Sequence, residues 1–181
     1  FNVFLDLKFH DIPHQVEGAA ASAVLSGADM LTMHAVGGSA MMAAGHRGAE
    51  AAAFERKVPV PATLAITVLT SMDAESLAAT GVSRALPEQV SALAIQAREA
   101  GLSGIVCSPQ EASSMRELLG PDAFIVTPGV RPAGSAKGDQ SRVATPAQAF
   151  ENGASHIVVG RPITQAEDPV AAFEAIAAEL A

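Results

Sequence analysis

Short runs of apolar and β-branched residues alternate with longer Ala-rich stretches from one end of the chain to the other. The short runs predict strands, and the Ala-rich stretches predict helices, several of them opened by Pro and followed by Gly. The six expected strands are Asn2–Leu7, Met30–His34, Thr63–Leu69, Gly104–Cys107, Phe124–Thr127 and His156–Val159. The six expected helices are Pro13–Ser26, Ala40–Ala53, Pro87–Ala100, Gln110–Leu119, Pro146–Asn152 and Pro169–Ala181. The glycines expected to end helices are Gly27, Gly101, Gly120 and Gly153.

The regular alternation of strand and helix predicts an α/β fold built from parallel βα units in a single domain, residues 1–181. A complete (β/α)8 TIM barrel has eight strands and roughly 250 residues, so six strands in 181 residues predict an incomplete barrel. The chain also opens on Phe1 inside a strand instead of on an initiator Met, and we therefore expect a truncated start.

Composition and net charge indicate which classes of binding partner the chain can have. Hydrophobic residues make up 49% of the chain, charged residues 17%, and the formal net charge is −8. Such a chain lacks the positive field that nucleic acid or an anionic membrane requires, so neither is expected as a partner. The single cysteine, Cys107, lies in an apolar run and predicts a buried, unreactive thiol in a reducing cytoplasm. No stretch approaches the ~20 apolar residues of a membrane span.

The first candidate for chemistry is an acid and an ammonium close together in the first strand. Strand alternation places Asp6 and Lys8 on one face, where they are either a buried ion pair or a catalytic pair. Asp11 precedes a helix start and is either an N-cap or a third member of the group. His10 and His14 have the i,i+4 spacing of metal ligands, but no third ligand is evident, so no metal site is expected.

The second candidate is Gly160-Arg161, which directly follows the last strand. A glycine there lets the backbone approach an anion, and an arginine can bind it bidentately, so the pair predicts a phosphate site. The alternative is an ordinary surface arginine. Pro128 and Arg131 open the longest stretch without helix or strand character, Pro128–Ala144, which we interpret as a lid.

A third group of polar residues ends the third strand. The hydroxyls of Thr70 and Ser71 either hydrogen-bond a polar planar ring or cap the turn at Asp73. His34 ends the second strand and is interpreted as a hydrogen-bonded structural histidine instead of an acid or base.

Four segments taken together resemble the orotidine 5′-monophosphate decarboxylase family: Phe-Leu-Asp-Leu-Lys-Phe-His-Asp-Ile-Pro, Val-Leu-Thr-Ser-Met, Val-Thr-Pro-Gly-Val-Arg-Pro and Val-Val-Gly-Arg-Pro-Ile-Thr. They occur in the family's order and at suitable intervals over essentially the whole chain. The resemblance begins at the third barrel strand, so it implies that residues 1–181 carry strands three to eight. It also implies conversion of orotidine monophosphate to UMP and CO₂, without metal or cofactor.

The resemblance assigns roles residue by residue. The family's Lys-Asp-Lys-Asp network matches here at Asp6, Lys8 and Asp11, with Lys8 as proton donor; the preceding lysine is absent. Ser71 matches the residue that reads the pyrimidine, and Gly160 with Arg161 matches the phosphate site. Asp11 would reach the neighbouring site of a homodimer.

Two positions depart from the family pattern, Gln15 where a threonine reaches ribose and Ala133 where a glutamine often binds phosphate. They fall on the ribose contact and the lid contact that the resemblance implies. Two rival hypotheses remain: a magnesium-dependent sugar-phosphate decarboxylase or aldolase of the same suite, and an inactive phosphate-binding barrel fragment. Without the upstream strands and lysine, we expect residues 1–181 alone to be inactive.

Overall fold

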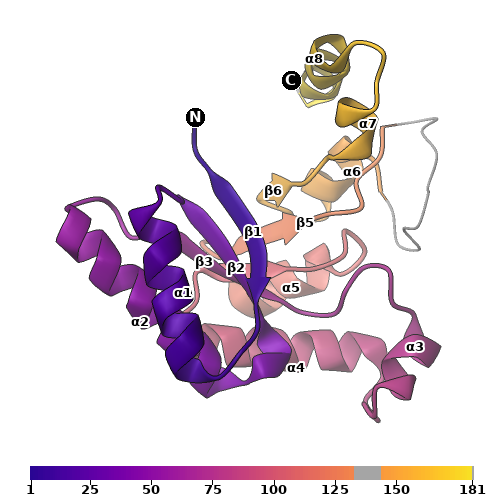
Figure 1. The fold of residues 1–181 in the computed structure, drawn as a ribbon. Helices are drawn as coiled ribbons and strands as arrows, with labels where there is room; N and C mark the ends of the chain where they lie inside the picture. Colours follow the sequence, from indigo (N-terminus) through magenta and orange to yellow (C-terminus); the bar gives the residue numbers. More distant parts are fainter. Residues whose placement is uncertain (133–143, 181) are drawn as a thin grey trace. The chain divides into compact units, whose positions relative to one another are not determined.

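The computed structural model describes residues 1–132 and 144–180. The chain divides into two compact units, the first made of residues 1–67 and 88–106 and the second of residues 68–87 and 107–181. Strand and helix alternate throughout (Figure 1).

The first unit is built on four parallel strands that follow one another in sequence order. They are β1 (Phe4–Phe9), β2 (Met30–His34), β3 (Ala62–Ile66) and β4 (Gly104–Val106). Their connections are the helices α1 (Pro13–Leu25), α2 (Ser39–Arg56) and α4 (Leu86–Glu99), with a 3-10 turn η1 (Ala35–Gly37) after β2. Leu31, Met33, Leu64 and Ile105 are completely buried, because a parallel sheet covered by helices buries its apolar strand residues.

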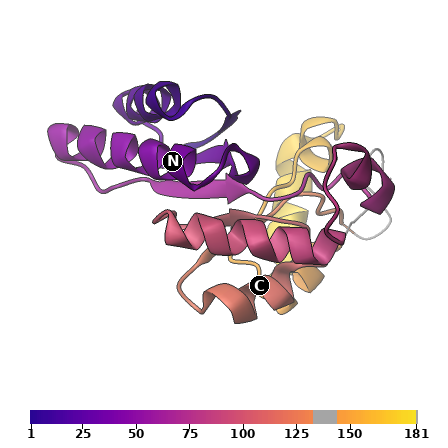
Figure 2. The same ribbon diagram turned by 90° about the horizontal axis from the view of Figure 1, so that it is seen from below.

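Helices α1 and α2 run side by side at very short range (Figure 2). Glycine makes this approach possible, since a Cβ on Gly48 of α2 would lie 2.2 Å from the carbonyl oxygen of Glu17 in α1. At the rim of this contact Arg47 forms an ion pair with Glu17 at 3.3 Å. The small residues of α2 therefore fix how closely the two helices pack.

The second unit contains the parallel strands β5 (Phe124–Thr127) and β6 (His156–Ile157). Its helices are α3 (Ala74–Ala79), α5 (Ala112–Leu119), α6 (Pro146–Glu151), α7 (Arg161–Thr164) and α8 (Pro169–Glu179). A small core of Val130, Ala149 and Ala154 packs against Ile157 and Val159. The Thr145 hydroxyl caps α6 by accepting a hydrogen bond from the Gln148 amide, and the side-chain oxygen of Gln148 accepts one from the Thr145 amide. This capping box fixes the start of the short helix.

The expected elements are present, with corrections at their ends. The expectation that the first strand spans Asn2–Leu7 was wrong, because β1 begins at Phe4 and runs to Phe9. The sequence also missed α3 and α7. The four glycines expected to end helices all have φ between 86° and 99°, the left-handed region that favours glycine.

Cys107 is buried and forms no disulfide within the described residues, as expected. No helix in the part of the chain that the structure describes is long and apolar enough to span a membrane. That the chain is a single domain stays a prediction.

Candidate active site

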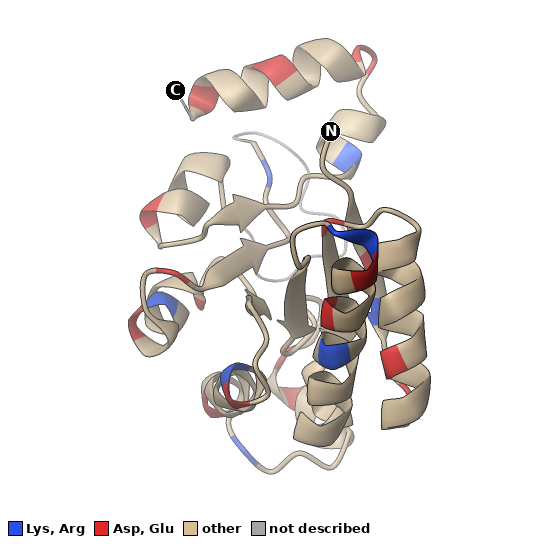
Figure 3. Ribbon diagram, turned by 90° about the vertical axis from the view of Figure 1, so that its left-hand side faces the viewer, with Lys and Arg blue, Asp and Glu red and all other residues tan. Residues whose placement is uncertain are grey.

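Among the six strands of the described residues, β1 alone carries Asp, Glu, Lys or Arg, and these residues are Asp6 and Lys8. The other acidic and basic residues lie on helices and connections (Figure 3). Charged side chains in a strand are costly unless they are paired or used, so this part of β1 marks the candidate active site.

Asp6 and Lys8 form an ion pair that stays open to solvent. The Lys8 ammonium donates to Oδ2 of Asp6, and the two side chains remain 38% and 42% exposed. The other carboxylate oxygen, Oδ1, accepts a hydrogen bond from Oγ1 of Thr32 in β2 at 2.8 Å. The buried ion pair considered from the sequence is therefore wrong, and a pair this exposed adds little to stability. The exposed pair of Asp6 and Lys8 is accessible to a ligand.

The backbone of β1 is irregular at this pair. Lys8 has φ 54°, a left-handed conformation that costs a non-glycine residue on the order of 1 kcal/mol. The pairing with β2 is regular at Leu5 and resumes at Phe9, so three residues of β1 lie opposite Thr32 alone. The uniform alternation expected for the first strand therefore fails at Lys8, although the predicted pairing with Asp6 is present.

Asp11 lies in the turn between β1 and α1 and is exposed. Its Oδ1 accepts a hydrogen bond from the amide of Ile12 at 2.6 Å, whereas the N-cap position of α1 is Ile12 itself, without a side-chain cap. The N-cap interpretation of Asp11 is therefore wrong. Among the described residues, Lys8 pairs with Asp6 and not with Asp11. Gln15 is exposed in the first turn of α1.

His34 lies at the end of β2, half-buried beside the ion pair. Its ring centroid is 5.4 Å from that of His10. Burial lowers the pKa of His34 below 6.5, and the nearby His10 and Lys8 lower it further while Asp6 opposes them. A neutral imidazole next to Lys8 follows. Within the described residues the His34 ring makes no hydrogen bond, so the hydrogen-bonded histidine predicted from the sequence is wrong.

A metal site was also considered at His10 and His14. Within residues 1–132 and 144–180, no group of three or more His, Cys, Asp or Glu side chains could hold a metal ion.

In the second unit, Gly160 and Arg161 follow β6, which ends at Ile157, after the two intervening residues Val158 and Val159. Gly160 is the N-cap of α7 without a side-chain cap, and its carbonyl accepts from the amides of Ile163 and Thr164 at 2.9 and 3.0 Å. A Cβ on Gly160 would meet nothing within 4 Å, so the backbone here is open. Arg161 is exposed as the first residue of the turn.

Pro128 and Arg131 open the long connection after β5. The amide of Arg131 donates to the carbonyl of Ala144 at 2.9 Å, and Val130 pairs with Ala144, so the two ends of the connection lie together. The Arg131 guanidinium donates to the Val130 carbonyl at 2.8 Å. The lid interpretation and Ala133 fall on residues 133–143 and lie outside the described residues.

Thr70 and Ser71 precede α3 in the second unit. The cap of α3 is formed by Asp73, which accepts from the Ser76 amide at 2.8 Å while the Ser76 hydroxyl accepts from the Asp73 amide at 3.0 Å. The Ser76 hydroxyl and amide also lower the pKa of Asp73. Asp73 and Ser76 thus cap one another at the start of α3. Ser71 is exposed and Thr70 is buried.

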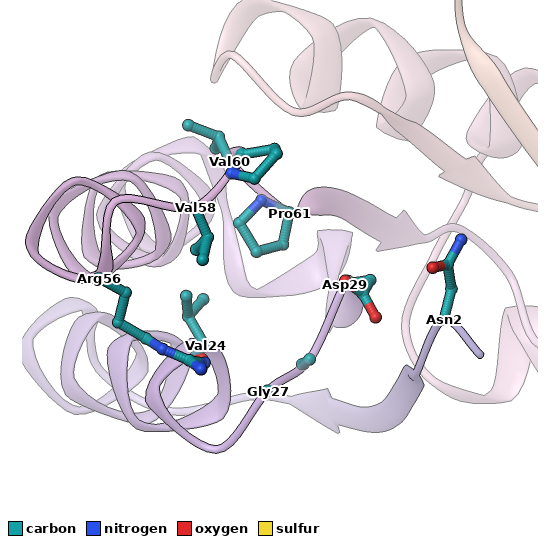
Figure 4. A pocket seen from close by; sticks show the side chains of 10 residues that line it. Asn2, Val24, Gly27, Asp29, Arg56, Val58, Val60 and Pro61 are labelled. Carbon is teal, nitrogen blue, oxygen red and sulfur yellow. The ribbon is translucent and has the colours of Figure 1, made fainter.

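A pocket of about 350 Å³ lies elsewhere in the first unit (Figure 4). Its lining includes Asn2, Asp29 and Pro61, which precede β1, β2 and β3, so it lies at the amino ends of these strands. Arg56 extends beside it toward the end of α1 and donates to the carbonyl of Val24 at 2.5 Å. In parallel α/β folds the chemistry lies at the opposite, carboxyl ends, where Lys8 is found.

A parallel βα fold with an ammonium and carboxylate pair toward the carboxyl end of a strand defines the class of (β/α)-barrel enzymes. Residues 1–176 match the model of the "Orotidine 5'-phosphate decarboxylase / HUMPS family". The chain belongs to this family, as the sequence motifs indicated.

Curated relatives support the same assignment. The chain is 57% identical to the orotidine 5'-phosphate decarboxylase of Moorella thermoacetica, over 98% of this chain and 71% of that protein. It is 55% identical to the enzyme of the same name from Anaeromyxobacter sp. strain K, over 98% of this chain and 75% of the relative.

A solved structure extends the likeness to the fold. The crystal structure of orotidine 5'-phosphate decarboxylase from Lactobacillus acidophilus superposes with a TM-score of 0.85 at 41% identity, covering 99% of this chain and 75% of that one. The six βα units thus form an incomplete (β/α)8 barrel, as expected from the sequence.

Proposed function

We propose that this chain catalyses the decarboxylation of orotidine 5′-monophosphate to UMP and CO₂, a step of pyrimidine biosynthesis. The observation that carries the proposal is the exposed Asp6 and Lys8 pair on β1, in a chain whose curated relatives bear the name of this enzyme. Decarboxylation of this substrate requires a solvent-accessible cation that is held beside a carboxylate.

Loss of CO₂ breaks the bond between C6 of the pyrimidine and the carboxylate, and leaves the electron pair on C6. The ring cannot delocalise this pair into a carbonyl, so a fixed cation next to C6 stabilises the developing carbanion. We assign that role to the Lys8 ammonium. The same ammonium then gives its proton to C6 to complete UMP, and it regains a proton from solvent.

Asp6 and Asp11 are assigned the task of orienting the Lys8 ammonium. Asp6 already accepts a hydrogen bond from this ammonium. Asp11 is exposed, and within residues 1–132 and 144–180 its carboxylate accepts a hydrogen bond only from the adjacent amide of Ile12, which leaves it available to the site of a second subunit. A homodimer is therefore part of the proposal.

The remaining contacts are proposed from the second unit. Ser71, with Thr70 beside it, would hydrogen-bond the pyrimidine, while Gly160 and Arg161 would bind the phosphate through the open backbone and a guanidinium. Pro128 and Arg131 would line the phosphate side. Neither metal nor cofactor enters this scheme, and the single buried Cys107 supports a cytoplasmic location.

A direct assay tests the proposal. Purified natural protein carrying this sequence is given orotidine 5′-monophosphate, and UMP and CO₂ are measured in parallel with and without EDTA. Equal formation of both products in the two arms is the expected result. Turnover that requires added Mg²⁺ and acts on a sugar phosphate instead would favour the sugar-phosphate rival. No turnover on either substrate would favour an inactive phosphate-binding barrel.

A further inference from the structure

Thr32 lies in the middle of β2 with its side chain completely buried, directly opposite the irregular part of β1. Its hydroxyl joins two groups of the candidate site. Oγ1 donates to Oδ1 of Asp6 at 2.8 Å and accepts from the backbone amide of Lys8 at 3.0 Å. One buried hydroxyl is thus bonded to both members of the ion pair.

The direction of both hydrogen bonds follows from the partners. A backbone amide can only donate, so the Lys8 amide must use a lone pair of the Thr32 oxygen. The single hydroxyl proton is then directed at Asp6, which accepts it as a carboxylate. Asp6 consequently has one oxygen on Thr32 and the other on the Lys8 ammonium, and the plane of its carboxylate is set by both.

The bond to Lys8 also explains the local backbone. The left-handed conformation of Lys8 takes its amide out of the regular ladder between β1 and β2, and the Thr32 hydroxyl takes the place of the lost acceptor. A side chain without a hydroxyl would leave this partly buried amide without its acceptor. The Thr32 hydroxyl therefore couples the backbone conformation of Lys8 to the orientation of the Asp6 carboxylate.

We infer that Thr32 is a positioning residue for decarboxylation: its hydroxyl sets the geometry of Asp6 and Lys8 without itself touching the substrate. The inference rests on the proposed function of these two residues. Because Asp6 is half-exposed, water can replace the lost donor in a variant, so the loss should affect orientation and turnover more than folding.

The test compares Thr32→Val with Thr32→Ser in the natural protein carrying this sequence. Val keeps the shape and removes the hydroxyl, and Ser keeps the hydroxyl. Thr32→Val should lower kcat for UMP formation by roughly tenfold to a hundredfold while KM changes less than about threefold, since the interaction matters chiefly in the transition state. Thr32→Ser should stay within about threefold of wild type in both constants. Should Val fail to fold, Thr32→Ala, which leaves room for water, takes its place.

A double-mutant cycle separates positioning from general destabilisation. In an Asp6→Asn background, Thr32→Val should lower the residual turnover far less than it does in wild type, because the group it positions is gone. Equal losses in both backgrounds, or equal losses for Val and Ser, would overturn the inference. Wild-type kcat in Thr32→Val would overturn it as well, with the proposed function intact. A wild-type protein that forms no UMP would instead refute the proposed function.

Discussion

Lys8 shows which features of a single residue can be predicted from the sequence and which cannot. The pairing of Lys8 with Asp6 was predicted from their i,i+2 spacing and is present, although the strand is irregular at Lys8. The left-handed backbone of Lys8 was not predicted, because lysine has no preference for positive φ. The conformation is stabilised by Thr32, which lies 24 residues away in sequence. The role of Thr32 was missed for the same reason: a threonine within an apolar strand gives no local signal of its partners.

His34 allows a prediction about pH at this scale. Its pKa is lowered below 6.5, so between the folded value and 6.5 the unfolded chain binds more protons than the folded one. The contribution of neutral His34 to the stability of the folded state is complete above pH 6.5. It is lost as the pH falls toward the pKa of His34 in the folded state. His34→Asn should therefore show a smaller drop in Tm than wild type between about pH 7.5 and about pH 5.5. The exposed His14→Asn is the control, and an unchanged drop in His34→Asn would contradict the assignment.

Arg161 allows a prediction about binding. Loss of a charge-assisted contact of roughly 1.5–3 kcal/mol should weaken UMP binding by about tenfold to a hundredfold in Arg161→Ala. Uridine, which lacks the phosphate, should bind wild type and variant equally in the same calorimetric titration. Equal weakening for uridine would mean that Arg161 has a structural role and that the phosphate binds elsewhere.

At the scale of elements, local sequence predicted best where a segment is apolar and clearly bounded. The strands at Met30–His34 and Phe124–Thr127 agree residue by residue with prediction, since β-branched and apolar residues lie between polar or glycine-containing turns. The helices at Ala74–Ala79 and Arg161–Thr164 were missed, because they are too short to show helical periodicity. The capping pair at Asp73 and Ser76 was the only available signal for the first of them.

The close packing of α1 and α2 gives a prediction with a matched control. Gly48→Ala should lower the free energy of unfolding by about 1–3 kcal/mol, because its Cβ would meet the Glu17 carbonyl oxygen 2.2 Å away. Gly18→Ala in α1 meets nothing within 4 Å and should raise it by about 0.5–1 kcal/mol. Denaturant unfolding of both variants measures the difference. A stabilising Gly48→Ala would show that the two helices are free to separate.

At the scale of the whole molecule, the sequence motifs predicted the family and the incomplete barrel, both now confirmed by the relatives and the solved structure. The site itself was predicted only in part. The motifs proposed Asp6, Lys8 and Asp11 as candidate residues, but whether Asp11 caps a helix or stays exposed depends on where α1 begins, which is decided by the turn after β1.

Assembly is tested by mixing two inactive proteins. If Asp11 completes the neighbouring site, a Lys8→Ala subunit and an Asp11→Asn subunit together form one native site in each mixed dimer. An equimolar mixture, unfolded and refolded together, should then recover roughly a quarter of wild-type UMP formation. Each variant refolded alone should recover none. A mixture that remains inactive while forming dimers would show that Asp11 acts within its own subunit.

Lys8 carries the chemical step in this account, and Lys8→Ala tests that claim most directly. Lys57, at the end of α2, shares the left-handed backbone with φ 58° but lies beside the amino end of β3, so Lys57→Ala is the matched control. UMP affinity by calorimetry and CO₂ release are measured on the same preparations. Lys8→Ala should bind UMP within about tenfold of wild type and lose at least about a thousandfold in turnover, while Lys57→Ala keeps both. Turnover of Lys8→Ala within about tenfold of wild type, a loss of only ~1.4 kcal/mol, would contradict the account.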